Sequence, residues 1–206
     1  ESGQAVAFFS LEMGMNQLMM RLACSGARVN SRDVRAGRLG DVAKRQLWAE
    51  IAKIEQLSIH WCCRSGITVQ EATNEVAKLQ ARQDVGLVVF DYIGLASSEG
   101  ESQNVRVSNI SKGLQRMSRN LGVALLAASQ LSRAIEMRGD GEPKLSDLRD
   151  SGSLEQDADK VLFLHLAKDK QTAKMILAKN RNGAAGVGIR RVTFLADYAT
   201  FADMAR

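Results

Sequence analysis

The sequence predicts an α/β fold in which a parallel sheet is flanked by helices and antiparallel strands extend its C-terminal edge. Wholly apolar runs such as residues 87–90 are typical of strands that are buried on both faces. Stretches with helical spacing of apolar residues separate these runs, and this alternation predicts parallel strands joined by right-handed crossovers. The length of 206 residues and the 45% hydrophobic content suit one globular domain, so we expect residues 1–206 to form a single domain.

The first half of the chain is expected to contain three strands and three helices. Gly26 is expected to end the first helix, and Asp41 is placed to cap the second. Thr68 and Glu71 have the spacing of a capping box, which begins the third. The expected elements are a strand at residues 5–10, helices at 15–25 and from 41 to beyond 54, a strand at 57–61, a helix after 68 and a strand at 86–91.

The second half is expected to add one more helix and four strands. A polar stretch at residues 97–104 predicts a loop, and apolar residues at helical spacing predict a helix over 110–121 that Gly122 ends. Residues 123–129 predict a fourth buried strand, followed by a polar loop. The last strands are joined by short turns, which favours antiparallel pairing. They are expected at residues 161–166, 174–178 and 187–195, before a tail that ends near Phe201.

Composition argues against several classes of protein. No apolar run reaches membrane-spanning length and no signal peptide opens the chain, so we expect a cytoplasmic protein without membrane contact. The three cysteines are an odd number without C-x-x-C spacing, which favours reduced thiols. No cluster of His, Cys and carboxylates has zinc-ligand spacing, so we interpret His60 and His165, on expected strands, as structural residues.

The net charge of +5 lies entirely in the second half of the chain. Residues 1–100 carry 11 Lys+Arg and 11 Asp+Glu, whereas residues 101–206 carry 17 and 12. We therefore expect any contact with a polyanion in the second half, although a modest excess of this size is also common on solvated surfaces.

Three of the expected strands end in polar residues that are suited to chemistry. Asp91 ends the apolar strand, Glu12 follows the first strand and Gln130 follows the fourth. The carboxyl ends of neighbouring parallel strands share one edge of the sheet, where ligands bind in open α/β folds. Two carboxylates and an amide there suit hydrolysis of a phosphoanhydride, with Asp91 holding Mg²⁺ through water. Alternatively, Asp91 only stops a strand, Glu12 is an exposed helix-start acid and Gln130 is a loop amide.

Several segments resemble the RecA-like ATPase domain of DnaB-type replicative DNA helicases. They occur in the order found in that family and extend over essentially the whole chain, and the segment at 147–159 is highly specific. The segments are Ser10-Leu11-Glu12-Met13, Phe90-Asp91-Tyr92, Ser129-Gln130-Leu131-Ser132-Arg133, residues 147–159 and Lys179-Asn180-Arg181-Asn182-Gly183.

The resemblance implies a ring-shaped homo-hexamer that moves along single-stranded DNA and hydrolyses ATP, with Mg²⁺, at subunit interfaces. Glu12 matches the glutamate that activates the attacking water, and Asp91 matches the Walker B aspartate. Gln130 matches the glutamine that senses the γ-phosphate and signals its presence to the DNA-binding loops. Lys179 and Arg181 match the basic pair that reaches the nucleotide of the adjacent subunit. Residues i and i+2 of a strand point to one side, so both cations could face one phosphate. An exposed basic strand end is the alternative.

Arg133, Arg149, Asp150 and Gly152 match positions on the loops of the family's central channel, which bind DNA. Glycine and backbone N–H groups allow close approach to phosphate, and arginine adds charge-assisted hydrogen bonds. Such contacts hold the DNA backbone without reading bases, as movement along any sequence requires. Internal pairing of Arg149 with Asp147 or Asp150 is the alternative. The family also implies a helicase loader and a primase as partners, and a bacterial or phage source.

The family's phosphate-binding loop, G-x-x-x-x-G-K-[ST], has no counterpart, because no Gly-Lys dipeptide occurs. In the family this loop precedes the strand expected at residues 5–10, so we expect the chain to begin after it, as a fragment or as a divergent protein. Without the loop we expect weak ATP binding. The family's amino-terminal domain and linker helix also lack counterparts. Gly94, Asp150 and Ala184 stand where the family usually has Gln, Glu and Pro.

Two alternatives to a helicase motor follow from the same residues. A RecA-type recombinase shares the strand-end chemistry, although the segment at 147–159 and the Lys179/Arg181 pair favour the helicase. The second alternative is an ATP-independent module for DNA binding or subunit assembly, which suits a chain without the phosphate-binding loop.

Overall fold

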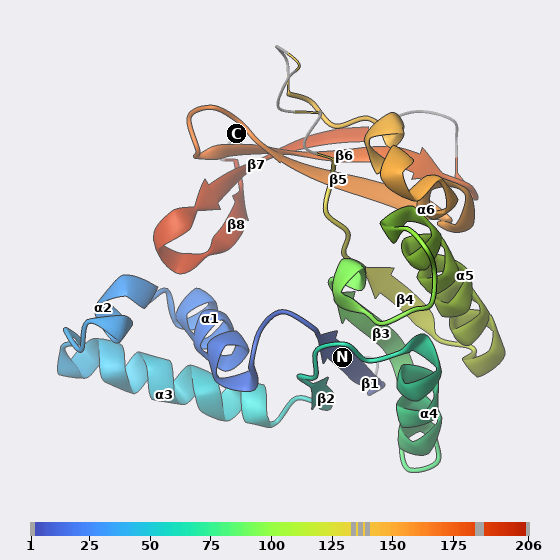
Figure 1. Cartoon of the computed structure of the whole chain (residues 1–206). Helices are drawn as coiled ribbons and strands as arrows, with labels where there is room; N and C mark the ends of the chain where they lie inside the picture. Colours follow the sequence, from blue (N-terminus) through green and yellow to red (C-terminus); the bar gives the residue numbers. More distant parts are fainter. Residues whose placement is uncertain (1–2, 133–134, 136–137, 139–140, 184–187, 205–206) are drawn as a thin grey trace. The chain divides into compact units, whose positions relative to one another are not determined.

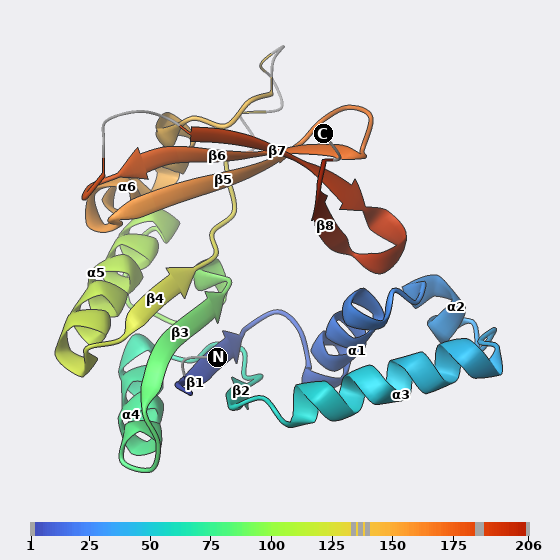
Figure 2. The ribbon, with the colours of Figure 1, turned by 180° about the vertical axis from the view of Figure 1, so that it is seen from behind.

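The computed structural model divides into two compact units, which are drawn from opposite sides in Figures 1 and 2. The first unit comprises the described parts of residues 1–14, 58–161 and 179–184, and the second comprises those of 15–57, 162–178 and 185–206. The expectation that residues 1–206 act as one domain stays a prediction. The residues that the structure describes are 3–132, 135, 138, 141–183 and 188–204.

A parallel sheet of four strands forms the centre of the first unit. Its order is β2-β1-β3-β4, and each neighbouring pair is parallel. The register places Ser10 opposite Asp91 and Phe90 opposite Ala127. The expected parallel sheet is therefore confirmed. Its strands are β1 (Ala5–Ser10), β2 (Ile59–Cys62), β3 (Val85–Asp91) and β4 (Ala124–Ala127).

Two helices of the first unit, α4 (Val69–Gln80) and α5 (Gln103–Leu121), share a hydrophobic core with the sheet (Figure 2). Because side chains alternate along a strand, Val88 and Phe90 of β3 point to the same face, where both are completely buried. The Phe90 ring stacks on Phe9 of β1, with centroids 4.7 Å apart. Leu87 and Val89 are only half-buried, so the burial expected on both faces is found on one.

Strand β4 lies at one end of the strand order and differs from its prediction. The apolar run at 123–129 predicted a buried strand, but Ala124 and Leu126 are exposed, and 60% of Leu126 is accessible. Among the described residues β4 pairs only with β3, so it is an edge strand of this sheet. An apolar sequence run alone did not distinguish an edge strand from a central one.

The second unit contains the helices α1 (Met15–Ala27), α2 (Ser31–Arg35) and α3 (Asp41–Glu55). Gly26 lies inside α1 and not beyond its end, and a Cβ at this position would overlap the Glu50 side chain of α3. Gly40, not Asp41, occupies the N-cap of α3, without a side-chain capping bond. Helix α2 was not predicted, and the Asn30 side chain caps it.

The C-terminal strands form a second sheet with the order β5-β6-β7-β8. Strand β7 pairs antiparallel with β6 and with β8, which confirms the antiparallel pairing expected for this part of the chain. Strand β8 lies where only a tail was predicted, and its Phe201 contacts Phe194 of β7, with ring centroids 4.9 Å apart. The strands are β5 (Lys160–Leu166), β6 (Thr172–Asn180), β7 (Gly188–Leu195) and β8 (Thr200–Asp203).

The three cysteines, Cys24, Cys62 and Cys63, are free, as expected for reduced thiols. Desolvation raises the pKa of each thiol. Within the described ranges, no helix combines the length and the apolar character needed to cross a membrane.

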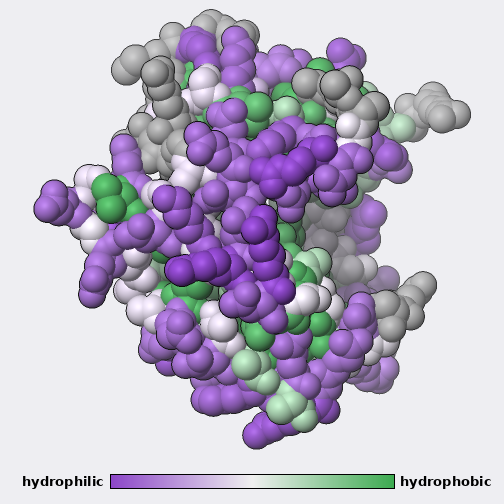
Figure 3. Space-filling model, turned by 90° about the vertical axis from the view of Figure 1, so that its right-hand side faces the viewer, coloured by the Kyte–Doolittle hydropathy of each residue, from purple (hydrophilic) through white to green (hydrophobic). Residues whose placement is uncertain are grey.

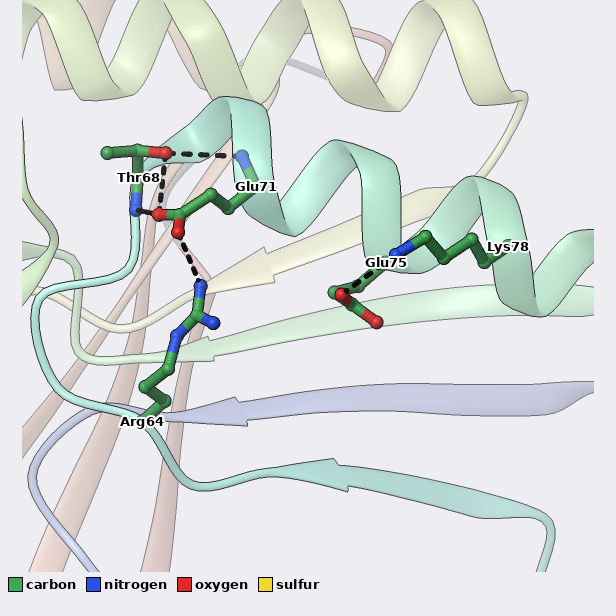
Figure 4. Close-up of polar contacts among 5 residues, drawn as sticks. All are labelled: Arg64, Thr68, Glu71, Glu75 and Lys78. Atoms are coloured by element: carbon green, nitrogen blue, oxygen red, sulfur yellow. Dashed lines mark hydrogen bonds and ion pairs between the residues drawn. The ribbon is translucent and has the colours of Figure 1, made fainter.

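The start of α4 is the capping box that the sequence predicted (Figure 4). Thr68 Oγ1 accepts a hydrogen bond from the Glu71 N–H at 3.2 Å, and Glu71 Oε2 accepts one from the Thr68 N–H at 2.8 Å. The second carboxylate oxygen of Glu71 pairs with Arg64 Nη2 at 2.8 Å. These bonds, above all the one from the Thr68 backbone, hold the pKa of Glu71 below its usual value. The loop after β2 is thereby tied to the first turn of α4.

Helix α5 begins earlier than its apolar spacing predicted. It starts at Gln103, within the stretch 97–104 predicted as a loop, because Ser102 Oγ accepts a hydrogen bond from the Val105 N–H at 3.3 Å. It ends as predicted at Gly122, whose φ of +65° is a left-handed conformation that glycine adopts without steric cost.

We predict that Thr68→Ala destabilises the protein by about 1 kcal/mol, because it removes the acceptor that satisfies an unpaired N–H group of α4. Denaturant unfolding monitored by circular dichroism measures the change. Thr73→Ala on the same helix is the matched control: the Thr73 hydroxyl donates back to the Val69 carbonyl inside the helix, so its loss should be nearly neutral. Equal destabilisation by both substitutions would contradict the capping role.

Candidate functional site

The ends of β1, β3 and β4 are joined by backbone hydrogen bonds at one edge of the parallel sheet. The Leu11 N–H donates to the Asp91 carbonyl at 2.7 Å, which links the chain after β1 to the end of β3. The Ala128 N–H donates to the Phe90 carbonyl at 2.9 Å, and the Ile93 N–H returns a bond to the Ala128 carbonyl at 3.0 Å. The chain positions of Glu12, Asp91 and Gln130 therefore lie at or just beyond three neighbouring strand ends, as the sequence predicted.

The three strand-end side chains differ in exposure but share the lack of an internal partner among the described residues. Glu12 and Gln130 are exposed, and Asp91 is half-buried. Within the described part of the chain, none of these side chains takes part in a hydrogen bond or ion pair, so their oxygens are free to bind a ligand. Two carboxylates and an amide without internal partners are suited to binding a cation and a water molecule.

Ser10 positions Glu12, and sequence reasoning did not identify this role. The Ser10 hydroxyl is buried, donates to the Met13 carbonyl at 2.8 Å and accepts from the Met13 N–H at 3.2 Å. These two bonds close a tight turn in which Glu12 stands at the tip. A serine that bonds to the backbone three residues later is typical of such turns, and this was the signal available in the sequence.

Residues 145–157 form two short helical elements that were not predicted as such. The 3₁₀ helix η3 (Leu145–Ser151) leads directly into α6 (Gly152–Asp157). Of the residues matched to DNA contact, Arg149 and Asp150 lie in η3 and Gly152 begins α6. The side chains of Arg149 and Asp150 lie outside the described part of the structure, as does Arg133 entirely.

The segment before η3 is organised by the buried carboxylate of Asp147. Its Oδ2 accepts hydrogen bonds from the Lys144 N–H at 2.7 Å and from Arg138 Nη2, and its backbone carbonyl accepts one from the Ser132 N–H at 3.3 Å. The bond from Arg138, with a smaller contribution from Lys144, lowers the pKa of Asp147 although burial opposes this shift. One aspartate thus connects three separate positions of the chain that follows β4.

Lys179 and Arg181 meet at the carboxyl end of α6. Lys179 Nζ donates to the carbonyls of Glu155 and Gln156, the latter at 3.3 Å, and Arg181 Nη2 donates to the same Gln156 carbonyl at 2.6 Å. Arg181 Nη1 also pairs with Asp159 Oδ1 at 2.7 Å. Both side chains bind the same carbonyl oxygen, although Arg181 lies one residue beyond β6, and that both cations face one phosphate stays a prediction.

Helix α6 is fixed to α5 through Asp157. The Ser111 hydroxyl donates to Asp157 Oδ2 at 2.6 Å, and Gln115 Nε2 donates to the Asp157 carbonyl at 2.8 Å. Figure 3 shows a face of the molecule on which hydrophilic residues predominate and hydrophobic residues form only small, separate areas. Leu154 of α6 also packs against the hydrophobic core, so hydrogen bonds and this apolar contact together hold α6.

The model of the family "DnaB-like helicase C terminal domain" matches residues 1–203. The chain belongs to this family. A curated relative from Bacillus subtilis, the replicative DNA helicase DnaC, is 35% identical over the whole chain, and the replicative DNA helicase DnaB of Geobacillus stearothermophilus is 34% identical. In each case the match takes up 47% of the relative, so this DnaB-like chain spans about half the length of these relatives.

Two solved structures have the same fold as this DnaB-like chain. The "ATPase Domain of G40P" has a TM-score of 0.90 at 31% identity, with 98% of this chain and 75% of that chain covered. A DnaB-like replicative helicase, described with its interactions with primase, has a TM-score of 0.89 at 31% identity, with 98% of this chain and 51% of that chain covered. The RecA-like α/β fold expected from the sequence is thereby confirmed.

We predict that Asp147→Asn destabilises the protein by about 2 kcal/mol at pH 7, because it weakens hydrogen bonds from Arg138 and Lys144 to a buried charge. The folded-state pKa of Asp147 is lowered, so its stabilisation is present above the unfolded value near pH 4 and disappears as the pH falls through the lowered pKa. Denaturant unfolding at pH 7 and near pH 2.5 measures the difference.

The control for this measurement is Asp197→Asn, which changes an exposed carboxylate that has no ion pair among the described residues. It should leave the free energy of unfolding unchanged at both pH values. A deficit for Asp147→Asn that does not shrink in acid would show that poorer packing, not the missing charge, is the cause.

Proposed function

We propose that this chain is the motor portion of a replicative DNA helicase that hydrolyses ATP, with Mg²⁺, in a homo-hexameric ring around single-stranded DNA. The observation that carries the proposal is the joining of the ends of β1, β3 and β4, which brings the positions of Glu12, Asp91 and Gln130 to one edge of the sheet. Membership of the DnaB-like family supports it. The chain covers about half of its curated relatives, so the activity of the whole protein is part of the proposal.

The residues present fit a magnesium ion that is held largely by a nucleotide. No group of three or more His, Cys, Asp or Glu side chains suited to a metal occurs within the described residues. Mg²⁺ commonly takes one or two carboxylates together with water and phosphate oxygens, and Asp91 supplies one half-buried carboxylate without an internal partner among those residues. Asp91 is therefore the residue that would hold Mg²⁺, through water.

The residues present fit a nucleotide only in part. ATP supplies the phosphoanhydride bond whose cleavage drives the motor, and Mg²⁺ neutralises its charge. Glu12 would accept the proton of the attacking water at a carboxylate oxygen, and the Gln130 amide would hydrogen-bond where the terminal phosphate lies. No segment of this chain supplies a G-x-x-x-x-G-K-[ST] cradle, so weak ATP binding by these 206 residues alone is part of the proposal.

Lys179 and Arg181 are proposed to act on the nucleotide of the adjacent subunit. Within the described residues they bind the end of α6, and no hydrogen bond links them to Glu12, Asp91 or Gln130. The carboxylates lie at the strand ends and the cations at the end of α6. This separation suits a catalytic site that is completed by two neighbouring subunits. An arginine supplied in this way stabilises the charge of the transition state and makes hydrolysis depend on ring formation.

DNA is proposed to bind at Arg133, Arg149, Asp150 and Gly152, in the half of the chain that carries the net positive charge. The primase in the description of one related structure concerns that protein. For the protein described here, we propose a primase and a helicase loader as partners and a cytoplasmic location.

The alternative functions are less well supported for the whole protein. Nothing in the family match favours a RecA-type recombinase. An ATP-independent assembly or DNA-binding role is favoured for these 206 residues taken alone, because they lack the phosphate cradle.

We predict that Glu12→Gln in the full-length protein lowers the ATPase rate at least about 100-fold while nucleotide binding stays close to wild type, because the base is removed and the shape is kept. Steady-state ATPase assays and fluorescence titration with a labelled nucleotide measure the two quantities. Glu55→Gln, at the exposed end of α3, is the matched control and should change neither. An unchanged ATPase rate in Glu12→Gln would remove Glu12 from the mechanism.

Action across a subunit boundary is tested by mixing two inactive variants. Rings assembled from Glu12→Gln and Arg181→Ala subunits contain some interfaces with an intact glutamate on one side and an intact arginine on the other. We predict that such rings recover ATPase activity that neither variant has alone. Absence of recovery in rings shown to be mixed would place both residues at the same subunit's nucleotide.

We predict that replacing Arg133 and Arg149 with alanine weakens binding of single-stranded DNA and reduces the slope of log affinity against log salt by about 0.7 for each phosphate that is no longer neutralised. Fluorescence anisotropy at several salt concentrations measures the slope. Arg82→Ala, which removes an exposed arginine beyond the end of α4, is the control and should leave the slope unchanged. An intact slope in the double variant would exclude these two arginines from DNA binding.

A further inference from the structure

Arg181 is held in place by three hydrogen bonds to the chain at and beyond the end of α6. Its Nη1 donates to Asp159 Oδ1 at 2.7 Å, its Nη2 donates to the Gln156 carbonyl at 2.6 Å, and its backbone N–H donates to the Asp159 carbonyl at 2.8 Å. A guanidinium is planar and rigid, so bonds from two of its nitrogens fix its plane as well as its position. The side chain is therefore oriented before any ligand is bound.

The carboxyl end of α6 provides acceptors for this arrangement. The last carbonyls of a helix have no partner within the helix, and here those of Glu155 and Gln156 accept from the two cations. The Asp159 carboxylate adds the negative charge that offsets the repulsion between Lys179 and Arg181. Since Asp157 fastens α6 to α5, the acceptors themselves are held on a rigid base.

Stability alone gives a weak reason for the Asp159–Arg181 pair. The Arg181 side chain is 41% exposed and that of Asp159 is 67% exposed, and ion pairs in such positions contribute little to folding. A guanidinium has five N–H donors, and the bonds to Asp159 and Gln156 take two of them. The others stay available for a phosphate, in a fixed orientation.

We propose that Asp159 is a positioning residue, which holds the Arg181 guanidinium in the orientation needed to meet the terminal phosphate at the neighbouring subunit. This inference rests on the proposed function, because it assumes that Arg181 acts on a nucleotide. An arginine that is already oriented loses less freedom when charge develops on the phosphate, so its effect falls on the transition state. The expected signature of removing Asp159 is a lower kcat with an unchanged KM.

The first test measures the arginine itself, without nucleotide. The full-length protein is treated with phenylglyoxal, which modifies accessible arginines, and the rate at each site is followed by mass spectrometry of peptides. Asp159→Ala should raise the modification rate of Arg181 several-fold. The internal control is the pair of Arg190 and Asp203, which has the same 2.7 Å separation and is exposed on both sides. Asp203→Ala should leave the rate at Arg181 unchanged. An unchanged rate at Arg181 in Asp159→Ala would overturn the proposal.

The second test measures catalysis in the same full-length variants. Asp159→Ala should lower kcat for ATP about 2- to 5-fold, the change in rate that corresponds to one exposed ion pair, with KM and the midpoint of thermal unfolding unchanged. Arg181→Ala should lower kcat about 1000-fold. The double variant should be no slower than Arg181→Ala, since Asp159 acts only through Arg181. Asp159→Glu should recover part of the rate, and Asp203→Ala should behave as wild type.

The outcomes separate this inference from the proposed function. If Arg181→Ala leaves hydrolysis unchanged, the role of the arginine fails, and the positioning role with it. If Arg181→Ala is slow but Asp159→Ala is not, only the positioning role fails. A higher kcat in Asp159→Ala would also overturn it, because Asp159 would then restrain the arginine instead of orienting it.

Discussion

The pairing of β3 on both of its edges is the constraint on which the rest of the first unit depends. Strand β3 pairs in parallel with β1 on one side and with β4 on the other, and the backbone hydrogen bonds continue beyond the strand ends. Main-chain atoms make these bonds, so the sheet register sets the positions of Glu12, Asp91 and Gln130. A slip of one residue in either pairing would turn a strand's side chains to the opposite face and separate the three positions.

The segment at 147–159 connects parts of the first unit that the sheet does not reach. Three of its aspartates have different partners: Asp147 binds Arg138, Asp157 binds Ser111 of α5, and Asp159 binds Arg181. The contacts of Asp157 and Asp159 join residues that are distant in the sequence, whereas Asp147 binds the nearby chain before η3. These three carboxylates therefore all have partners within the described part of the chain.

The sequence predicted those features that depend on local pattern. Apolar runs located the strands of the parallel sheet, and the Thr68/Glu71 spacing predicted the start of α4 because a capping box involves only neighbouring residues. The exposure of β4 was not predictable in this way, since it depends on the order of strands in the sheet. The close approach of Glu50 to Gly26 was missed because Glu50 lies on another helix.

In the candidate site, too, the sequence predicted what depends on local pattern and not what depends on tertiary contacts. Strand-end residues could be read from the sequence, because the carboxyl ends of parallel strands meet at one edge. The i, i+2 spacing predicted that Lys179 and Arg181 share a side, but it could not identify their partners. Those partners lie 22 to 25 positions away from Arg181 in the sequence, and only the tertiary fold brings them together.

Helix α6 has a mechanical consequence that follows from its length. Its six residues extend over about 9 Å, which is too short for the helix to bend. Gly152 at one end belongs to the group proposed to grip the nucleic acid, and Gln156 near the other carries the acceptor shared by both cations. Because α6 is this short and Asp157 fastens it to α5, one rigid element sets the position of Gly152 together with the acceptors of the two cations.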